Sequence, residues 1–252
     1  MRDSTVRDET MSDRHDYTKD VGLAEVRVRL AVLRDRVARG GAVRHILEVG
    51  VGSGDATVML VEAFLQHGGR ITCVDTDAGV LAAVRARLAA RGLPQPECVH
   101  AKAEAVDLPP ASFDHVVLLN VLEHIQDPVA ALERLRGCAT ADGRFHISVN
   151  IAGSLHRWLG VEMGIIDDVE QLSASDHELG HHRIYTVPLL LAQLEAAGLK
   201  ATDVHRFYLK PFPTSVLAQL PWQTHAALDA LGTRFPEFAS YVYVQAERRR
   251  PE

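Results

Sequence analysis

The chain has 252 residues, a net charge of −6 and an ordinary globular composition, with 47% hydrophobic and 24% charged residues. This length suits one large domain or two small ones, and it can bury a core without disulfide or metal support. The negative charge disfavours a broad basic face for nucleic acid, and no apolar run approaches the roughly 20 residues of a membrane span. The three cysteines lie far apart in the sequence, which argues against a zinc ribbon or a disulfide framework.

The first 20 residues mix acidic and basic side chains and contain no apolar segment. We therefore predict a disordered tail over residues 1–20 and no signal peptide. Apolar residues then recur at helical spacing from Leu23 to Val37, and two glycines at 40 and 41 end the predicted helix. Residues 21–252 are expected to form one domain of a cytoplasmic protein that works as a monomer or homodimer.

Predicted strands and helices alternate between residues 41 and 149, which we expect to be the cofactor-binding core. Short apolar runs indicate buried strands, and stretches of helical periodicity separate them. The strands are predicted at 45–49, 70–75, 97–100, 113–119 and 143–149, and the helices at 55–67, 77–91 and 128–136. Alternation of this kind predicts an α/β fold with a doubly wound parallel sheet.

The alternating pattern ends after residue 149. Residues 150–185 contain no predicted strand, and a helix is predicted at 186–198 before a strand near 200–208. Residues 211–237 look irregular or helical, and a last strand is predicted from 240 to 246. Ligands of open parallel sheets bind at the carboxyl ends of the strands, and long loops in compact domains are usually functional. We therefore predict lid insertions at about 150–185 and 211–237.

The most informative motif is His45-Ile-Leu-Glu-Val-Gly-Val-Gly-Ser-Gly54, a strand that leads through three glycines into a helix. Glycines let the backbone turn tightly and approach a ligand closely. Position 55 is aspartate where a dinucleotide fingerprint needs glycine, and the lysine of a phosphate-binding loop is missing. Glu48 would suit a cationic amino group better than a pyrophosphate. Asp75 ends the next strand, where a carboxylate can accept both hydroxyls of a ribose.

Further motifs follow in order along the chain. They are Val74-Asp-Thr-Asp77, Ala103-Glu104 with Asp107-Leu-Pro109, Ser112-Phe-Asp114, and Val121-Leu-Glu-His124. Together with the glycine loop, they resemble the motifs of the class I S-adenosylmethionine-dependent methyltransferases over about residues 40–150. The resemblance implies a methyltransferase that uses S-adenosyl-L-methionine. It also implies a Rossmann-like sheet of seven strands, mostly parallel with an antiparallel last strand.

By the same resemblance, cofactor-binding roles fall on residues at the ends of the predicted strands. These are Glu48, Gly50, Gly52, Gly54, Asp75, Thr76, Lys102, Ala103, Glu104 and Asn120. Tyr17, in the amino-terminal tail, is a further candidate that would fold over the cofactor. His124 is expected to be a packing or capping residue.

A second motif, His177-Glu-Leu-Gly-His181, matches that of zinc metalloproteases. On a helix, the two histidines would hold zinc and Glu178 would act as the base. However, residues 172–176 look loop-like, and Gly180 lowers helix propensity. The longer signature would also need glycine and histidine where Ile184 and Val187 stand. We interpret the match as a coincidence and predict no metal, with a zinc metalloprotease as the alternative function.

The surrounding segment, Gly180-His-His-Arg-Ile-Tyr185, resembles one found in methyltransferases that act on small molecules. Methyl transfer is an in-line displacement that needs a lone pair on the acceptor, so a hydroxyl acceptor benefits from a neutral histidine base. His181 is the first candidate for this base and His177 the second, although these histidines could equally serve only to close the lid through hydrogen bonds. The candidate substrate-binding residues are Asn150, His182, Arg183 and Tyr185.

The predicted function is methyl transfer to an oxygen or amine nitrogen of a small metabolite, for example in secondary metabolism. The sequence Leu119-Asn-Val-Leu122 differs from the Asn-Pro-Pro-Tyr and Pro-Cys patterns of enzymes that methylate nucleic-acid bases. We therefore expect a small-molecule acceptor, with neither nucleic acid nor membrane as a partner. A non-catalytic S-adenosylmethionine-binding protein remains a further alternative.

Overall fold

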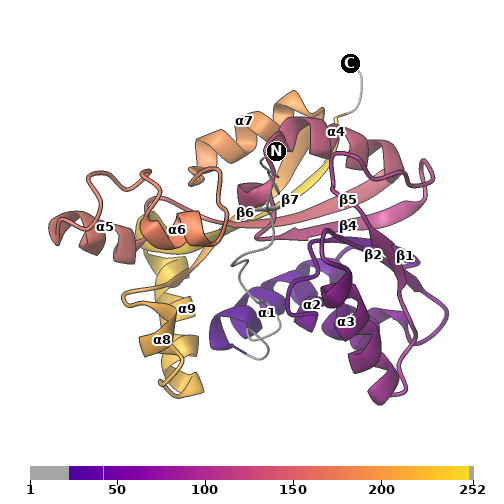
Figure 1. Cartoon of the computed structure of the whole chain (residues 1–252), viewed down its shortest axis with the longest axis horizontal. Coiled ribbons are helices and arrows are strands. Elements are labelled where there is room, and N and C mark those ends of the chain that lie inside the picture. Colours follow the sequence, from indigo (N-terminus) through magenta and orange to yellow (C-terminus); the bar gives the residue numbers. More distant parts are fainter. Residues whose placement is uncertain (1–22, 42, 250–252) are drawn as a thin grey trace, which may run out of the picture.

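A sheet of seven strands organises the computed structural model, which describes residues 23–41 and 43–249 (Figure 1). The order across the sheet is β3-β2-β1-β4-β5-β7-β6. The strands are β1 (His45–Val49), β2 (Arg70–Asp75), β3 (Glu97–His100), β4 (Phe113–Leu119), β5 (Ala139–Asn150), β6 (Leu199–Leu209) and β7 (Ala239–Arg248). The first five strands run parallel, and β7 is antiparallel to both of its neighbours. The predicted fold class is confirmed.

Helices cover both faces of the sheet. On one face lie α1 (Ala24–Ala38), α2 (Asp55–Leu60), which continues as a π-helical turn η2 (Val61–Leu65), and α3 (Ala78–Ala90) (Figure 1). On the other face lie α4 (Pro128–Cys138) and α7 (Val187–Ala196). Each layer has its own apolar core: Leu33, Leu60 and Leu88 belong to the first, and Leu132 and Leu190 to the second.

Sequence signals explain where the core elements begin. All five residues of β1 are buried, because this strand lies in the middle of a sheet that is covered on both faces. Asp127 caps α4 by accepting a hydrogen bond from the Ala130 amide at 3.0 Å, and Thr186 caps α7 through the Leu189 amide at 3.2 Å. The helices predicted at 128–136 and 186–198 therefore begin within one residue of their predicted starts.

The two long connections contain short helices gathered at one end of the sheet (Figure 1). The first connection holds α5 (Leu155–Glu162) and α6 (Ala174–Glu178). The second holds α8 (Thr214–Leu217), α9 (Trp222–Arg234) and a 3₁₀ turn η4 (Pro236–Phe238). Because β5 and β6 are both antiparallel to β7, they are parallel to each other, and both connections leave from the same edge of the sheet.

Residues 172–176 differ from the loop expected there. The helix α6 begins at Ala174, and Ser173 and Asp176 form a reciprocal capping box at its start. The predicted tail, with Tyr17, lies outside the described residues. Within the described part of the chain, we find no helix that has both the length and the apolar character needed to span a membrane.

Candidate active site

The glycine loop between β1 and α2 forms an open cradle. Gly50, Gly52 and Gly54 all have left-handed backbone conformations, with φ values of +73°, +53° and +74°. A Cβ atom on Gly50 would lie 2.4 Å from a methyl group of Val121, so only glycine fits there. A Cβ atom on Gly52 would meet nothing within 4 Å, which means that the loop backbone faces open space. The loop can therefore bring its backbone close to a ligand.

Asp75, at the end of β2, joins this loop to the neighbouring strand. Its Oδ2 atom accepts a hydrogen bond from the Val51 amide at 2.8 Å, and Oδ1 accepts one from the Asp77 amide at 2.9 Å. Each carboxylate oxygen has a second lone pair, so the group can also accept the hydroxyls of a ribose. The adjacent Thr76 is exposed at the same end of the strand.

The other predicted cofactor residues lie after β3 and β4. The Ala101 amide donates to the Asp75 carbonyl at 3.1 Å, which keeps the turn containing Lys102, Ala103 and Glu104 beside Asp75. Asn120 directly follows β4 in a left-handed conformation, with a φ of +54°. The strand order reverses between β1 and β4, and such reversal points are where open α/β sheets bind ligands. The structure therefore brings these predicted residues to one edge.

Glu48 has a different environment from the one its position in the motif suggests. Its side chain is buried within β1, and Oε2 accepts hydrogen bonds from the Thr57 hydroxyl at 2.7 Å and the Cys73 thiol at 3.8 Å. Burial raises the pKa of Glu48 to about 8. The carboxyl group is thus mainly protonated at neutral pH and connects β1 to α2 and β2. A direct contact with a cationic amino group stays a prediction.

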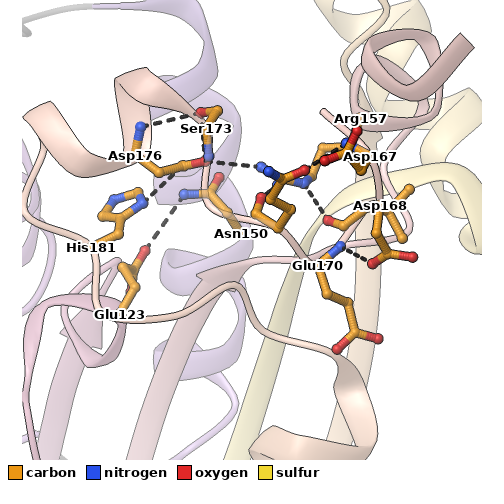
Figure 2. Close-up of polar contacts among 11 residues, drawn as sticks. Glu123, Asn150, Arg157, Asp167, Asp168, Glu170, Ser173, Asp176 and His181 are labelled. Atoms are coloured by element: carbon orange, nitrogen blue, oxygen red, sulfur yellow. Dashed lines mark hydrogen bonds and ion pairs between the residues drawn. The ribbon is translucent and has the colours of Figure 1, made fainter. Parts of the chain in front are cut away.

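His181 and Asp176 form a hydrogen-bonded pair in the first of the two long connections (Figure 2). The His181 Nδ1 atom lies 3.0 Å from Asp176 Oδ1, while Asp176 Oδ2 accepts from the Ser173 hydroxyl at 2.6 Å and from Arg157 at 3.2 Å. Burial alone would raise the pKa of Asp176, but hydrogen bonds from His181, Ser173 and Arg157 hold it well below its usual value. The ionised Asp176 favours the proton on Nδ1 of His181, so the neutral ring carries its lone pair on Nε2.

Two residues from the end of β4 lie against His181. Glu123 and His124 belong to the 3₁₀ turn η3 (Leu122–His124), and the His124 and His181 rings meet edge to face at a centroid distance of 4.7 Å. Burial, with the nearby His181, lowers the pKa of His124 to about 4, so His124 is neutral at physiological pH. Burial raises the pKa of Glu123, whose Oε1 atom lies 3.5 Å from the Asn150 side-chain amide (Figure 2).

Residues 182–185 of the same connection hold this arrangement together. The His182 amide donates to the Glu123 carbonyl at 2.8 Å, and the Arg183 guanidinium donates to the carbonyls of Leu122, Ile125 and Gln126. Tyr185 is fully buried and donates its hydroxyl to Gln193 Oε1 at 2.8 Å. The polar atoms of Arg183 and Tyr185 are therefore engaged within the protein, and the side chain of His182 is exposed.

The structure separates the two histidines of the metalloprotease-like motif. The helix α6 ends at Glu178, and Gly180 adopts a left-handed conformation with a φ of +74°. His177 is exposed, whereas the His181 side chain is only 8% exposed and turns toward Glu123 and His124. His177 and His181 therefore do not share one helical face, which the motif needs in order to bind zinc.

Sequence reasoning missed Asp176 and the side chain of Glu123. The Ser173-x-x-Asp176 spacing is a capping-box pattern, and it marks the helix start that positions Asp176. Glu123 was noticed only as part of a family motif. Its contact with His181 spans 58 positions of the chain, and no local pattern could have indicated it.

Comparison with known proteins agrees with the fold and the glycine loop. The family model described as a methyltransferase domain matches residues 47–145, which include the strand-end residues described above. A ubiquinone biosynthesis O-methyltransferase from Xylella fastidiosa is 27% identical over 204 residues, which are 81% of this chain and 75% of that protein. The matched methyltransferase domain and this relative are consistent with a class I S-adenosylmethionine-dependent methyltransferase. The chain is a methyltransferase, and its cofactor is S-adenosylmethionine.

Solved structures of this methyltransferase fold agree with the architecture. The N1-methyltransferase of 1,6-didemethyltoxoflavin from Burkholderia thailandensis, solved with 1,6-didemethyltoxoflavin and S-adenosylhomocysteine, has a TM-score of 0.62 at 22% identity. The match covers 92% of this chain and 81% of that one. A methyltransferase-like protein from Bacillus halodurans has a TM-score of 0.63 at 16% identity and covers 88% of this chain and 99% of that one. At these identities the similarity supports the fold alone.

The open glycine cradle and the free acceptor capacity of Asp75 both suit this cofactor. Gly52 leaves space for a ligand against the loop backbone, and Asp75 can bind the two ribose hydroxyls with its remaining lone pairs. The turn at 102–104 lies beside Asp75, where the adenine end of the cofactor would follow its ribose. The residues present at this edge of the sheet therefore fit S-adenosylmethionine.

Proposed function

We propose that this methyltransferase transfers the methyl group of S-adenosylmethionine to a hydroxyl oxygen of a small molecule. The observation that carries the proposal is the His181–Asp176 pair, which leaves one imidazole lone pair beside the buried turn that follows β4. The similarity to an enzyme named as an O-methyltransferase supports oxygen as the acceptor atom. An amine nitrogen is the second candidate, because an amine that is already neutral needs no base.

In this proposal the strand ends hold the methyl donor. Gly50, Gly52 and Gly54 pass beneath its methionine part, Asp75 binds the ribose, and Asn120 lines the methionine side. Bound S-adenosylmethionine supplies an electrophilic methyl group on a positively charged sulfur atom. Thr76, Lys102, Ala103 and Glu104 border the nucleoside, and they contribute orientation rather than chemistry.

The lid side of the proposed site holds the acceptor and removes its proton. The acceptor oxygen forms a bond to the methyl carbon while the carbon–sulfur bond breaks and its electron pair returns to sulfur. The lone pair of His181 Nε2 assists the loss of the hydroxyl proton, and Asp176 stabilises the positive charge that forms on the ring. Asn150 and His182 border the acceptor, whereas Arg183 and Tyr185 fix the turn that carries Glu123 and His124.

The experiment that tests this function supplies the full-length protein with isotope-labelled methyl donor and a panel of small hydroxyl compounds and amines. We expect label in a methyl ether, with S-adenosylhomocysteine as the second product. A labelled N-methyl product would replace oxygen with nitrogen as the acceptor atom. Donor binding without labelled product across fractionated metabolite pools would favour a non-catalytic binding protein.

Two variants make the result specific to the proposed residues. His181→Ala should lose transfer to a hydroxyl acceptor while it still binds S-adenosylhomocysteine. His67→Ala is the matched control, because His67 is exposed in the connection before β2 and has no role in the proposal. Equal loss of activity in both variants would contradict a specific role for His181.

A further inference from the structure

Three metal-ligating side chains converge where the first lid connection meets the end of β4. Glu123, His124 and His181 each offer one ligand atom, and the three atoms lie within 4.8 Å of one another. Glu123 and His124 are consecutive in the turn η3, whereas His181 comes from the segment after α6. The hydrogen bond from the His182 amide to the Glu123 carbonyl fixes the two segments against each other.

Both histidines are oriented in the way that metal-binding histidines usually are. A ligating imidazole typically donates its other ring N–H to a carboxylate or to a backbone carbonyl. His181 Nδ1 is hydrogen-bonded to Asp176, which is itself held by Ser173 and Arg157. The ring of His124 is hydrogen-bonded to the backbone of Leu179 and Gly180. The outer contacts of a metal site are thus already present.

Glu123 supplies an independent sign that a ligand belongs here. The residue is 3% exposed, and its Oε2 atom is buried without a hydrogen-bond partner among the described residues. Its other oxygen has only the long contact of 3.5 Å to Asn150. A buried carboxylate oxygen without a partner costs free energy, and a bound cation would satisfy it.

We propose that Glu123, His124 and His181 bind a divalent transition-metal ion that also binds the acceptor hydroxyl. This inference rests on the proposed function and replaces one part of it, since the free ring nitrogen of His181 then binds the metal ion and no longer accepts the hydroxyl proton directly. Two imidazole nitrogens with one carboxylate suit zinc, cobalt, manganese or iron(II), whereas magnesium and calcium prefer oxygen ligands. Bonds of about 2.0–2.2 Å would bring the three atoms closer together than in the structure, which small side-chain rotations can achieve.

Three protein ligands leave coordination positions for water and for the acceptor oxygen. A metal ion lowers the pKa of a bound water molecule to about 7, and it acts on the pKa of a bound hydroxyl in the same direction. The hydroxyl proton then passes to solvent water. The acceptor oxygen forms its bond to the methyl carbon as the bond from that carbon to sulfur breaks. In this scheme His181 holds the ion and acts on the hydroxyl through it.

The proposed site differs from the zinc site that the His-Glu-x-x-His motif suggests. The motif would use His177 and His181, but His177 is exposed and absent from the group of three. The sequence predicts no metal because the three ligands come from segments that are far apart in the chain and form no local motif. In the structure, the three candidate ligands are residues 123, 124 and 181. The proposal therefore revises the prediction that the protein binds no metal.

The test measures metal binding directly in the full-length protein. The protein is stripped with a chelator, titrated with Co²⁺, and followed by the visible absorbance that appears when cobalt gains nitrogen ligands; elemental analysis gives the stoichiometry. We expect one equivalent of Co²⁺, displaced by Zn²⁺ but not by Mg²⁺. His181→Ala and Glu123→Gln should each weaken binding at least tenfold, and His177→Ala should leave it unchanged.

Other outcomes overturn either the metal proposal or the function on which it rests. Loss of Co²⁺ binding in His177→Ala would indicate that the His-Glu-x-x-His motif binds the metal. If no cobalt absorbance appears, or if Glu123→Gln binds Co²⁺ as tightly as the wild type, these three residues are not the metal ligands. S-adenosylhomocysteine affinity, measured in every variant, confirms that the protein is folded. Methyl transfer by the metal-free protein would refute the metal while the proposed function stands, whereas absence of transfer with metal bound would refute the function.

Discussion

The two sides of the site are built in different ways. The donor side comes from the ends of four neighbouring parallel strands, where the Val51 amide of the left-handed glycine loop donates a hydrogen bond to the Asp75 carboxylate. The acceptor side joins a turn after β4 to a lid segment more than 50 residues later, through the His182 amide and the Arg183 guanidinium. In the proposed site, the sheet edge thus supplies the cofactor platform, and contacts between distant segments supply the acceptor side.

Burial favours the uncharged form of ionisable groups on both sides, which is the protonated form of an acid and the deprotonated form of a histidine. On the donor side, burial favours the protonated form of Glu48. On the acceptor side, burial favours the neutral form of histidines such as His124 and His156. The contributions of Glu48 and of these two histidines to stability should therefore be lost at opposite ends of the pH scale, which is testable.

The largest expected effect is on turnover in His181→Ala. Removal of the group that activates the acceptor should slow transfer to a hydroxyl by about 100- to 10,000-fold, because general acid–base groups contribute about that much. The rate is measured with labelled donor under saturating S-adenosylmethionine. A loss below about tenfold with a hydroxyl acceptor would mean that the lid side does not take part in proton removal.

The next effect concerns stability on the donor side as the pH rises. The pKa of Glu48 is about 8 in the folded protein and near its ordinary value of 4.5 when unfolded, so the folded state binds the extra proton between these values. Its stabilising contribution is complete below pH 4.5 and is lost as the pH rises through 8, by up to about 5 kcal/mol. In Glu48→Gln, the free energy of unfolding measured by urea denaturation should change less between pH 5 and 9 than in the wild type. A parallel pH dependence in both proteins would exclude Glu48 as its source.

His156, in α5 of the lid, should act in the opposite direction. Burial, with smaller contributions from nearby Lys210 and Arg157, lowers its pKa to about 4 from an unfolded value of 6.5, so the unfolded state binds the proton first. The contribution of His156 to the free energy of unfolding is fully present above pH 6.5. It decreases by up to about 3 kcal/mol as the pH drops toward 4. Melting His156→Gln beside the wild type from pH 7 to 4 measures this contribution. If the difference between the two proteins does not change with pH, this assignment is wrong.

The donor side could be predicted from sequence because its residues stand at fixed offsets from strand ends. Gly50, Asp75 and Asn120 each directly follow or end a strand that the apolar runs predict, and parallel strands bring their carboxyl ends together. The burial of Glu48 was not predictable in the same way, because it depends on the packing of Thr57 and Cys73 around the carboxyl group.

The acceptor side was only partly predictable. His181 was chosen for its chemistry and its place in a lid, but its partners Asp176, Glu123 and His124 depend on tertiary folding. The motif that contains His181 even suggests the wrong neighbour, His177, because Gly180 ends the helical geometry that the motif requires. Local spacing cannot reveal a contact that forms when a turn and a lid pack together.

The central claim is that donor binding and acceptor activation are separate tasks of the two sides. Calorimetric titration of S-adenosylhomocysteine into the wild type, Asp75→Ala and His181→Ala tests it most directly. Asp75→Ala should lose about 10- to 150-fold in affinity. This loss corresponds to about 1.5–3 kcal/mol, which is the usual contribution of hydrogen bonds to a charged group. His181→Ala should bind within about twofold of the wild type, since no donor contact is assigned to it. An equal loss of affinity in both variants, or full affinity in Asp75→Ala, would contradict the claim.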